Sequence, residues 1–191
     1  MHLIENLLRR TIGLDSASIG SSLIGQTVRM RMQSRGLTKF EDYGKYLQAT
    51  PAELNELIEA VVVKETWFFR DKEPFTVLAR LVLTEWLPAH PATPLRLLSV
   101  PCSTGEEPYS MAMALLDAGL PPERFRIDAV DISSRALETA KHAVYRKNSF
   151  RGQARGYRER HFQPAADGYL LNQSVRDRVR FFEEIFWIAV A

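Results

Sequence analysis

The chain has 191 residues, a formal net charge of +2, one cysteine and a hydrophobic content of 46%. These values are typical of an ordinary globular protein with one or two domains, and the low net charge gives no general attraction to nucleic acids or membranes. The lone Cys102 excludes an internal disulfide framework and a multi-cysteine metal site. The first residues lack the apolar core of a signal peptide, and no stretch approaches about 18 apolar residues. We therefore expect a cytoplasmic protein that does not insert into a membrane.

Apolar residues recur at helical spacing through the first 61 residues, which predicts a series of helices. The first ends at Gly13, the second covers about 17–34, and the third covers 40–47. The fourth begins at Thr50, where Thr50, Pro51 and Glu53 have the spacing of an N-cap, a first helical residue and a capping box. This part of the chain is predicted to be a helical domain.

A polar and aromatic stretch, KETWFFRD, occupies residues 64–71. We expect a helix over about 73–86 and then a linker, because the segment PAHPATP at 88–94 contains three prolines. Three consecutive aromatic residues most often belong to a core or to a plug between domains. If the stretch instead faces a cleft, Arg70 supplies a planar guanidinium for a carboxylate. The pattern alone leaves both interpretations open.

From Leu95 onward, short apolar runs alternate with helical segments, which is typical of a parallel α/β sheet. We predict strands over 95–100 and 126–130 and helices over 106–118 and 134–145. Residues 146–177 are largely polar and basic, with a hairpin-like segment GYLLNQSVRDRV near their end. The tail VRFFEEIFWIAVA supplies one or two more strands. The fold class is thus α/β, with a helical domain at the N-terminus.

The loop Ser103-Thr104-Gly105 joins the first strand to a helix N-terminus, which favours a carboxylate or phosphate ligand. A pyrophosphate loop needs three glycines, so the single Gly105 and the nearby Pro101 argue against one. The alternative is simple helix capping. Ser103 and Glu106 have the spacing of a capping box, and so do Thr104 and Glu107. The pattern supports both interpretations equally.

Asp131 ends the second predicted strand, where an acidic side chain can accept hydrogen bonds from ribose hydroxyls. It could instead cap the helix that follows. Ser133 can serve as that cap, which leaves Asp131 for a ligand, and we favour the ligand.

Basic residues gather in the second predicted helix and just after it, at Arg29, Arg31, Arg35 and Lys39. Arg31 and Arg35 share a helix face because they are four residues apart. A solvated face is the usual explanation, and an acidic protein partner is the sharper one. Nucleic acid lacks aromatic or glycine-rich support here, so we expect none as a partner.

Three segments together resemble the chemotaxis receptor methyltransferases of the CheR type. They are KETWFFRD at 64–71, PCSTGEEPYSMAMAL at 101–115 and AVDISSRALETAKHAVY at 129–145, and they occur in the family's order and spacing. The resemblance extends over about residues 1–181. It implies an enzyme that transfers a methyl group from S-adenosylmethionine to glutamate side chains of chemoreceptors, leaving S-adenosylhomocysteine. It also implies a Rossmann-like methyltransferase sheet with a small β-insertion, and no metal.

The resemblance also implies roles for individual residues. Arg70 lies at the methyl-transfer site and is the expected catalytic residue, and Lys64 stands where the family usually has asparagine. Arg29, Arg31 and Arg35 would meet the acidic helices of the receptor. The residues implied to bind the cofactor are Lys64, Thr66, Arg70, Glu107, Asp131 and Ile132.

The resemblance sets the expected domain boundaries. A helical receptor-recognition domain covers 1–72, a helix and proline-rich linker covers 73–94, and a partial methyltransferase domain covers 95–191, with the insertion at about 146–180. The family continues past Phe181 with further strands that complete the cofactor pocket, so we expect a truncated chain. We also expect a monomer.

The alternative is a non-catalytic receptor-binding remnant with an incomplete pocket. An NAD-dependent oxidoreductase is disfavoured by the single-glycine loop.

Overall fold

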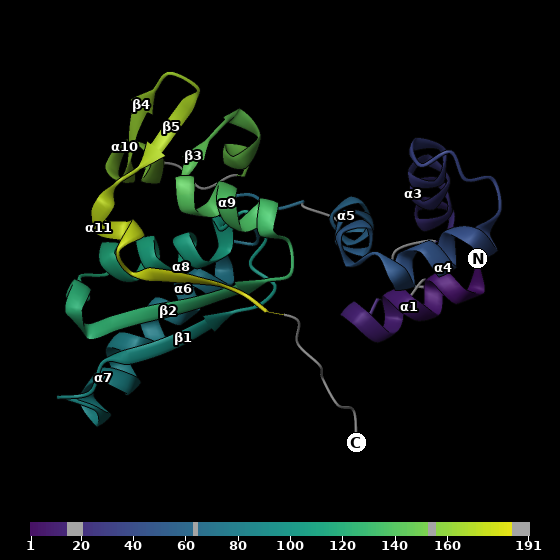
Figure 1. The fold of residues 1–191 in the computed structure, drawn as a ribbon. Helices are drawn as coiled ribbons and strands as arrows, with labels where there is room; N and C mark the ends of the chain where they lie inside the picture. Colours follow the sequence, from purple (N-terminus) through teal and green to yellow (C-terminus); the bar gives the residue numbers. More distant parts are fainter. Residues whose placement is uncertain (15–20, 63–64, 153–155, 185–191) are drawn as a thin grey trace. The chain divides into compact units, whose positions relative to one another are not determined.

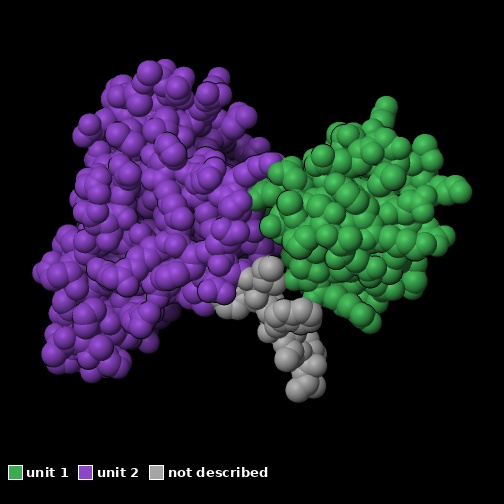
Figure 2. All heavy atoms as spheres, viewed as in Figure 1, with its two compact units in different colours: residues 1–63, 185–191 green, residues 64–184 purple. Residues whose placement is uncertain are grey.

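The computed structural model describes residues 1–14, 21–62, 65–152 and 156–184. Two compact units divide the chain after Val63, and Figure 2 shows them in different colours. The sequence placed this boundary at residue 72. The difference arises because Phe68, which is fully buried, packs in the core of the second unit.

The first unit is helical. It contains α1 (His2–Ile12), α3 (Ser21–Ser34), α4 (Phe40–Ala49) and α5 (Pro51–Val61) (Figure 1). Gly13 ends α1 in a left-handed conformation with φ of 67°, as predicted. The start of the second predicted helix lies outside the described residues. Each helix contributes apolar side chains to one buried core, which includes Ile4, Leu8, Ile24, Val28, Leu47, Leu57 and Ile58.

A helical segment precedes the first strand of the second unit. It consists of α6 (Glu73–Leu81), a π-helical stretch (Val82–Trp86) and α7 (Leu87–Ala89). Phe75 and Val82 are buried, and Val82 belongs to the core of this unit. The segment therefore packs as part of the α/β unit and continues three residues beyond the predicted end at Trp86.

A parallel sheet forms the centre of the second unit. Its strands are β1 (Leu95–Ser99), β2 (Phe125–Asp131) and β6 (Val179–Glu183), in the order β1-β2-β6. Helices α8 (Glu106–Asp117) and α9 (Ser134–His142) follow β1 and β2 and cover one face of the sheet (Figure 1). Apolar residues in parallel register, such as Ile127 opposite Val179, belong to the core. The predicted β-α-β-α unit is confirmed, and the α/β fold is Rossmann-like.

A small antiparallel sheet lies in sequence between β2 and β6. Its strands are β3 (Val144–Tyr145), β4 (Phe162–Ala165) and β5 (Gly168–Leu171), in the order β3-β5-β4. Short helices α10 (Tyr157–His161) and α11 (Gln173–Arg176) flank β4 and β5. This is the β-insertion that the sequence predicted at about 146–180.

Two sequence predictions in this region were wrong in detail. The helix predicted over 134–145 ends at His142, because Ala143 adopts a left-handed φ of 54° and Val144–Tyr145 pairs with β5. The segment GYLLNQSVRDRV is not itself a hairpin: β5 pairs with the preceding β4, and α11 follows. Of the strands predicted for the tail, β6 forms, and residues 185–191 lie outside the described part.

Within the described residues, no helix is long and apolar enough to cross a membrane. The same residues contain no cluster of three or more His, Cys, Asp or Glu side chains placed to hold a metal ion.

Candidate functional site

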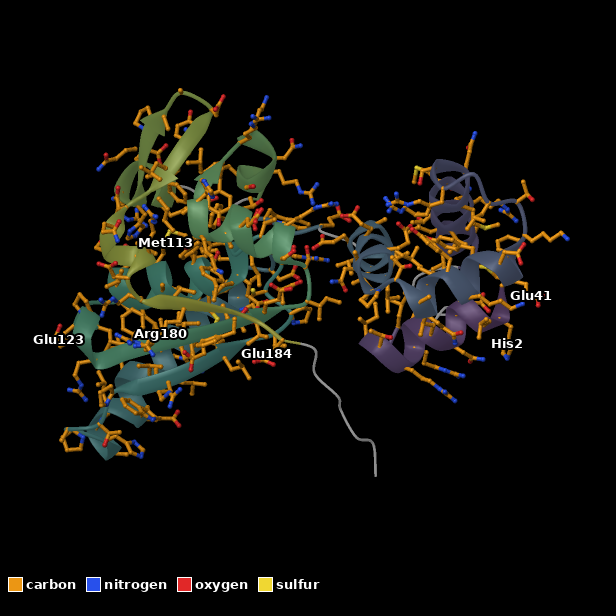
Figure 3. The ribbon with its side chains drawn as sticks, viewed as in Figure 1. His2, Glu41, Met113, Glu123, Arg180 and Glu184 are labelled. Carbon is orange, nitrogen blue, oxygen red and sulfur yellow. The ribbon has the colours of Figure 1, made fainter. Side chains whose placement is uncertain are left out.

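The carboxyl ends of β1 and β2 bring the predicted cofactor residues together. In an open α/β sheet, ligands bind in the crevice outside these strand ends. Here the ends meet the loop 100–105, the start of α8 and residues 131–133. The backbone N–H of Glu184, just after β6, donates to the Asp131 carbonyl oxygen at 3.3 Å, so all three strands end at this edge (Figure 3).

Asp131 ties the two loops of this edge to each other. Its carboxylate oxygens accept hydrogen bonds from the backbone N–H groups of Ser103 at 2.7 Å and Ser133 at 2.9 Å. The side chain is buried, with 4% exposed. Ser133 caps α9 by accepting from the Ala136 N–H at 3.0 Å, so the prediction that Ser133 rather than Asp131 is the cap is confirmed. The ribose-binding role of Asp131 stays a prediction, as does that of its half-buried neighbour Ile132.

The loop before α8 is closely packed. Gly105 has a φ of 92°, and a Cβ atom there would lie 2.8 Å from the Ala140 Cβ and 3.1 Å from the Tyr145 hydroxyl. The glycine is therefore needed for packing against neighbouring residues. Ser103 also adopts a left-handed φ of 48°, and its buried hydroxyl has no hydrogen-bond partner among the described residues. Strained backbone and an unpaired buried hydroxyl are features found at ligand sites.

Neither glutamate at the start of α8 forms a capping box, so that interpretation was wrong. Glu106 is buried, with 2% exposed, and accepts hydrogen bonds from the hydroxyls of Thr104 at 2.6 Å and Ser149 at 2.9 Å. Burial raises the pKa of Glu106 above its usual value, and the hydroxyl donors only partly offset this effect. Glu107 is exposed at the strand edge and accepts from the Ser99 hydroxyl at 2.8 Å.

Sequence reasoning missed the environment of Glu106. Its partner Ser149 lies 43 residues away in sequence, in a 3₁₀ turn (Lys147–Phe150) between β3 and β4 of the small sheet. No local pattern in the sequence indicates this contact.

The aromatic stretch docks against α8 and this turn. The Phe68 N–H donates to the Ser149 carbonyl oxygen, and the Phe69 N–H donates to the Ser110 hydroxyl, both at 2.9 Å. The Phe68 ring is fully buried and packs edge-on against Tyr145 at 4.7 Å between ring centres. The sequence left open whether this stretch belongs to a core or faces a cleft, and the burial of Phe68 supports the core. The half-buried Thr66 precedes it, and Lys64 lies outside the described residues.

Arg70 lies at the surface of the docked stretch. Its guanidinium is 4.6 Å from the centre of the Trp67 ring and donates to the Glu65 carbonyl oxygen at 3.3 Å. Arg151 contacts the same indole at 4.2 Å and pairs with the Glu65 carboxylate at 2.8 Å. Phe69 and Asp71, on either side of Arg70, both have left-handed φ angles, 52° and 51°. This backbone conformation is rare for such residues and indicates a constrained segment.

In the helical unit, the three predicted receptor-binding arginines differ in their contacts. Arg31 binds both carboxylate oxygens of Glu53, at 3.0 and 2.7 Å, and Arg35 binds one of them at 2.7 Å. The Tyr43 hydroxyl donates to the same carboxylate at 2.9 Å. Arg29 is exposed, with its guanidinium 5.9 Å from the centre of the Phe40 ring. A direct receptor contact stays a prediction for all three.

Glu53 is the centre of this cluster, and only 1% of it is exposed. Burial alone would raise its pKa, but hydrogen bonds from Arg31, Tyr43 and Arg35 outweigh burial and hold the pKa below its usual value. Thr50 is the N-cap residue of α5, yet its side chain makes no capping bond, and Glu53 points to the arginines instead. The predicted capping box at this helix was therefore wrong.

Comparison with known proteins agrees with the two units. The family described as "CheR methyltransferase, all-alpha domain" matches residues 1–62, and "CheR methyltransferase, SAM binding domain" matches residues 64–184. The "Probable biofilm formation methyltransferase WspC" of Pseudomonas aeruginosa is 51% identical over 93% of the chain and 42% of the relative. The protein of the same name from Pseudomonas putida is 48% identical, over 90% of the chain and 41% of the relative. "Chemotaxis protein methyltransferase 1" of Pseudomonas aeruginosa is 29% identical, over 94% of the chain and 68% of the relative. The chain thus spans about two fifths of the length of the WspC relatives.

Proposed function

The chain belongs to the CheR methyltransferase family, and from this premise we propose that it transfers methyl groups from S-adenosylmethionine to glutamate side chains of a chemoreceptor-like protein in bacterial chemosensory signalling. Relatives named as chemotaxis protein methyltransferases support the reaction class. The observation that carries the proposal is the strand edge at which Asp131, Glu107 and the constrained loop 101–105 converge.

The chemistry of this edge fits the cofactor. S-adenosylmethionine carries a sulfonium and an ammonium group, which favour carboxylates, and ribose hydroxyls, which need acceptors. Glu107 offers an exposed carboxylate there, and each Asp131 oxygen retains a lone pair beyond its backbone hydrogen bond. The unpaired Ser103 hydroxyl is a further group that a ligand would satisfy. We propose that Glu107 contacts the cofactor from the start of α8, that Asp131 and the Ile132 backbone hold its nucleoside, and that Lys64, Thr66 and Arg70 lie toward the methionine end.

The bound cofactor supplies a methyl group already activated by its sulfonium. The protein then has to position a weakly nucleophilic carboxylate and remove its water. We assign the orientation of that carboxylate to Arg70, whose planar guanidinium can form a bidentate pair and keep the carboxylate ionised. The left-handed residues on either side of Arg70 limit the conformations of its backbone.

Receptor recognition is assigned to Arg29 of α3 and Arg35 of the turn that follows it. Arg29 and Arg35 would meet acidic receptor helices directly, because Arg29 is exposed and the Arg35 side chain retains 42% exposure. The guanidinium of Arg31 is occupied by Glu53 and Glu56, so we assign it to holding this surface in place.

A second candidate function is a receptor-binding module that does not bind the cofactor. The separate hydrophobic core of the helical unit favours this alternative, because such a unit can present α3 without the sheet.

Calorimetric titration with S-adenosylhomocysteine separates the two functions. The proposed enzyme should give saturable heat at micromolar ligand, and Asp131→Asn should weaken binding at least about tenfold, since it removes a charged acceptor. Asp128→Asn is the matched control, because Asp128 lies on the same strand but pairs with Arg96 at 2.7 Å. Absence of saturable heat in the wild type would instead support the binding module.

Arg70→Ala tests the catalytic assignment. We expect methyl transfer to a receptor substrate to fall about 100-fold, because orientation of the acceptor is lost, while the unfolding midpoint changes little. Arg96→Ala, on another exposed arginine, should retain activity. Unchanged turnover in Arg70→Ala would show that another residue positions the carboxylate.

A further inference from the structure

The α/β unit contains a cavity that the proposed function does not use. Its volume is about 320 Å³, and its lining includes Phe69, Phe75, Tyr157, Lys72, Ala114 and Asp117. These residues come from α6, the end of α8, α10 and the segment before α6. Helix α8 starts at the candidate cofactor edge, and Asp117 ends it. At 1.5 Å per residue, the two ends of this helix are about 16 Å apart, so the cavity is a separate site.

The walls of the cavity are aromatic. Phe69 packs edge-on against Phe75, with 5.4 Å between ring centres, and tilts against Tyr157 at 4.7 Å. Ala79 and Ala114 also line the cavity, and their short side chains occupy little of its volume. The cavity is also lined by Lys72, Thr76, Asp117 and Arg160, so aromatic and charged groups meet in a volume that can hold a small molecule. Flat rings at the wall favour a flat apolar ligand.

The charged groups of the lining determine the sign of the charge that a ligand should carry. Asp117 binds the Arg160 guanidinium at 2.6 Å and the His161 ring at 2.8 Å, so the carboxylate is balanced by a cation. Lys72 also lines the cavity, and no ion-pair partner for it is found in the part of the chain that the structure describes. The remaining charge is therefore a single positive one, which an anionic ligand would neutralise.

We propose that this cavity binds a small aromatic monoanion, with its ring system against the wall formed by Phe69, Phe75 and Tyr157 and its carboxylate or sulfonate at Lys72. The proposal is independent of cofactor binding, because it depends on none of the residues at the strand edge.

The test uses 2-naphthoate as the probe, titrated into the full chain by calorimetry. We expect saturable binding to one site, with 2-naphthamide, the neutral analogue, binding at least about five-fold more weakly. Lys72→Gln should reduce the affinity for 2-naphthoate to that for the amide and leave the amide unchanged. Lys141→Gln, at an exposed lysine of α9, is the matched control and should behave as the wild type.

Filling the cavity tests its location. Ala114→Leu and Ala79→Leu place a side chain in the same space from different helices, so either variant that keeps its circular dichroism spectrum should abolish saturable binding. A second cavity, in the helical unit, is lined by Arg29 and Phe40, and Arg29→Gln should leave binding unchanged. The proposal is overturned if the wild type does not bind 2-naphthoate, if Lys72→Gln binds both probes as the wild type does, or if Arg29→Gln rather than the leucine variants loses binding.

Discussion

Glu53 in the helical unit and Glu106 in the α/β unit are both almost completely buried, with 1% and 2% exposed, but their pKa values move in opposite directions. Two guanidinium groups and a phenol donate to Glu53, whereas the donors to Glu106 are neutral: the hydroxyls of Thr104 and Ser149 and a backbone N–H. For Glu53 the cationic partners outweigh the burial penalty, and for Glu106 the penalty prevails. Cationic partners thus hold the pKa of Glu53 low despite its small exposed surface, whereas the neutral donors to Glu106 do not offset its burial.

The two glutamates therefore have different consequences for their units. Glu53 connects α3, α4 and α5 through Arg31, Tyr43 and its own helix, so its charge contributes to tertiary structure. Glu106 lies beside the candidate cofactor loop, where its ionised form is penalised by burial. Perturbed carboxyl groups of this kind are enriched at functional sites.

Of the substitutions that test this comparison, Glu53→Gln should change stability the most. The substitution leaves Arg31 and Arg35 without their shared anion, and we expect the helical unit to lose about 2–4 kcal/mol, less than a fully buried pair because both arginines are partly exposed. Amide hydrogen exchange, measured on proteolytic peptides, should show the loss of protection in α3–α5. Glu41→Gln removes an exposed pair with Lys45 and is the control, with no measurable change expected. Equal protection in Glu53→Gln and the wild type would refute the role of this cluster.

Glu106→Gln should have a smaller effect of opposite sign. Glutamine can still accept from Thr104 or Ser149 and carries no charge to desolvate, so we expect the α/β unit to gain about 1 kcal/mol at neutral pH. Urea unfolding in a Trp187→Phe background, followed by the fluorescence of Trp67 and Trp86, measures this unit. Destabilisation at neutral pH would mean that Glu106 is stabilised as an anion and that the contrast with Glu53 is wrong.

Lowering the pH should reduce the stability difference between each of these two variants and the wild type. The pKa of Glu53 is lowered from its usual value of 4.5, so its stabilisation is present above about pH 4.5 and is lost as the pH falls through the folded-state pKa. The pKa of Glu106 is raised, so its unfavourable contribution is absent below that pH and develops as the pH rises through the folded-state value. Hydrogen exchange at pH 7 and near pH 3.5, corrected for intrinsic rates, should show each variant approaching the wild type in acid. A constant difference would contradict the assignment to titration.

The elements of the α/β unit could largely be predicted, because their signals are local. The apolar run before Pro101, the Gly105 turn and the small residues of α8 define a β-α-β pattern in consecutive residues. Ser133 was identified as a cap for the same reason. Errors occurred where long-range pairing decided the structure, as at Val144–Tyr145, which joins β5 instead of extending α9.

The environments of the site residues were less predictable. Asp131 and Glu107 could be placed at a strand end and a helix start from the sequence. The hydrogen bonds of Glu106 and Glu53 come from residues 43 and 22 positions away, at Ser149 and Arg31, and depend on tertiary packing. The sequence therefore indicated which residue types gather at the edge, whereas their protonation depends on contacts that only the folded chain makes.

The insertion of the small sheet between β2 and β6 has a consequence for synthesis of the protein. Strand β2 pairs with β1 on one side, but its other edge stays open until Val179–Glu183 leaves the ribosome. Residues 132–178 must be made first, which at about 5–20 residues per second takes several seconds. During that interval the nascent chain presents the unpaired edge of β2, so we expect it to be able to pair with other chains before β6 emerges.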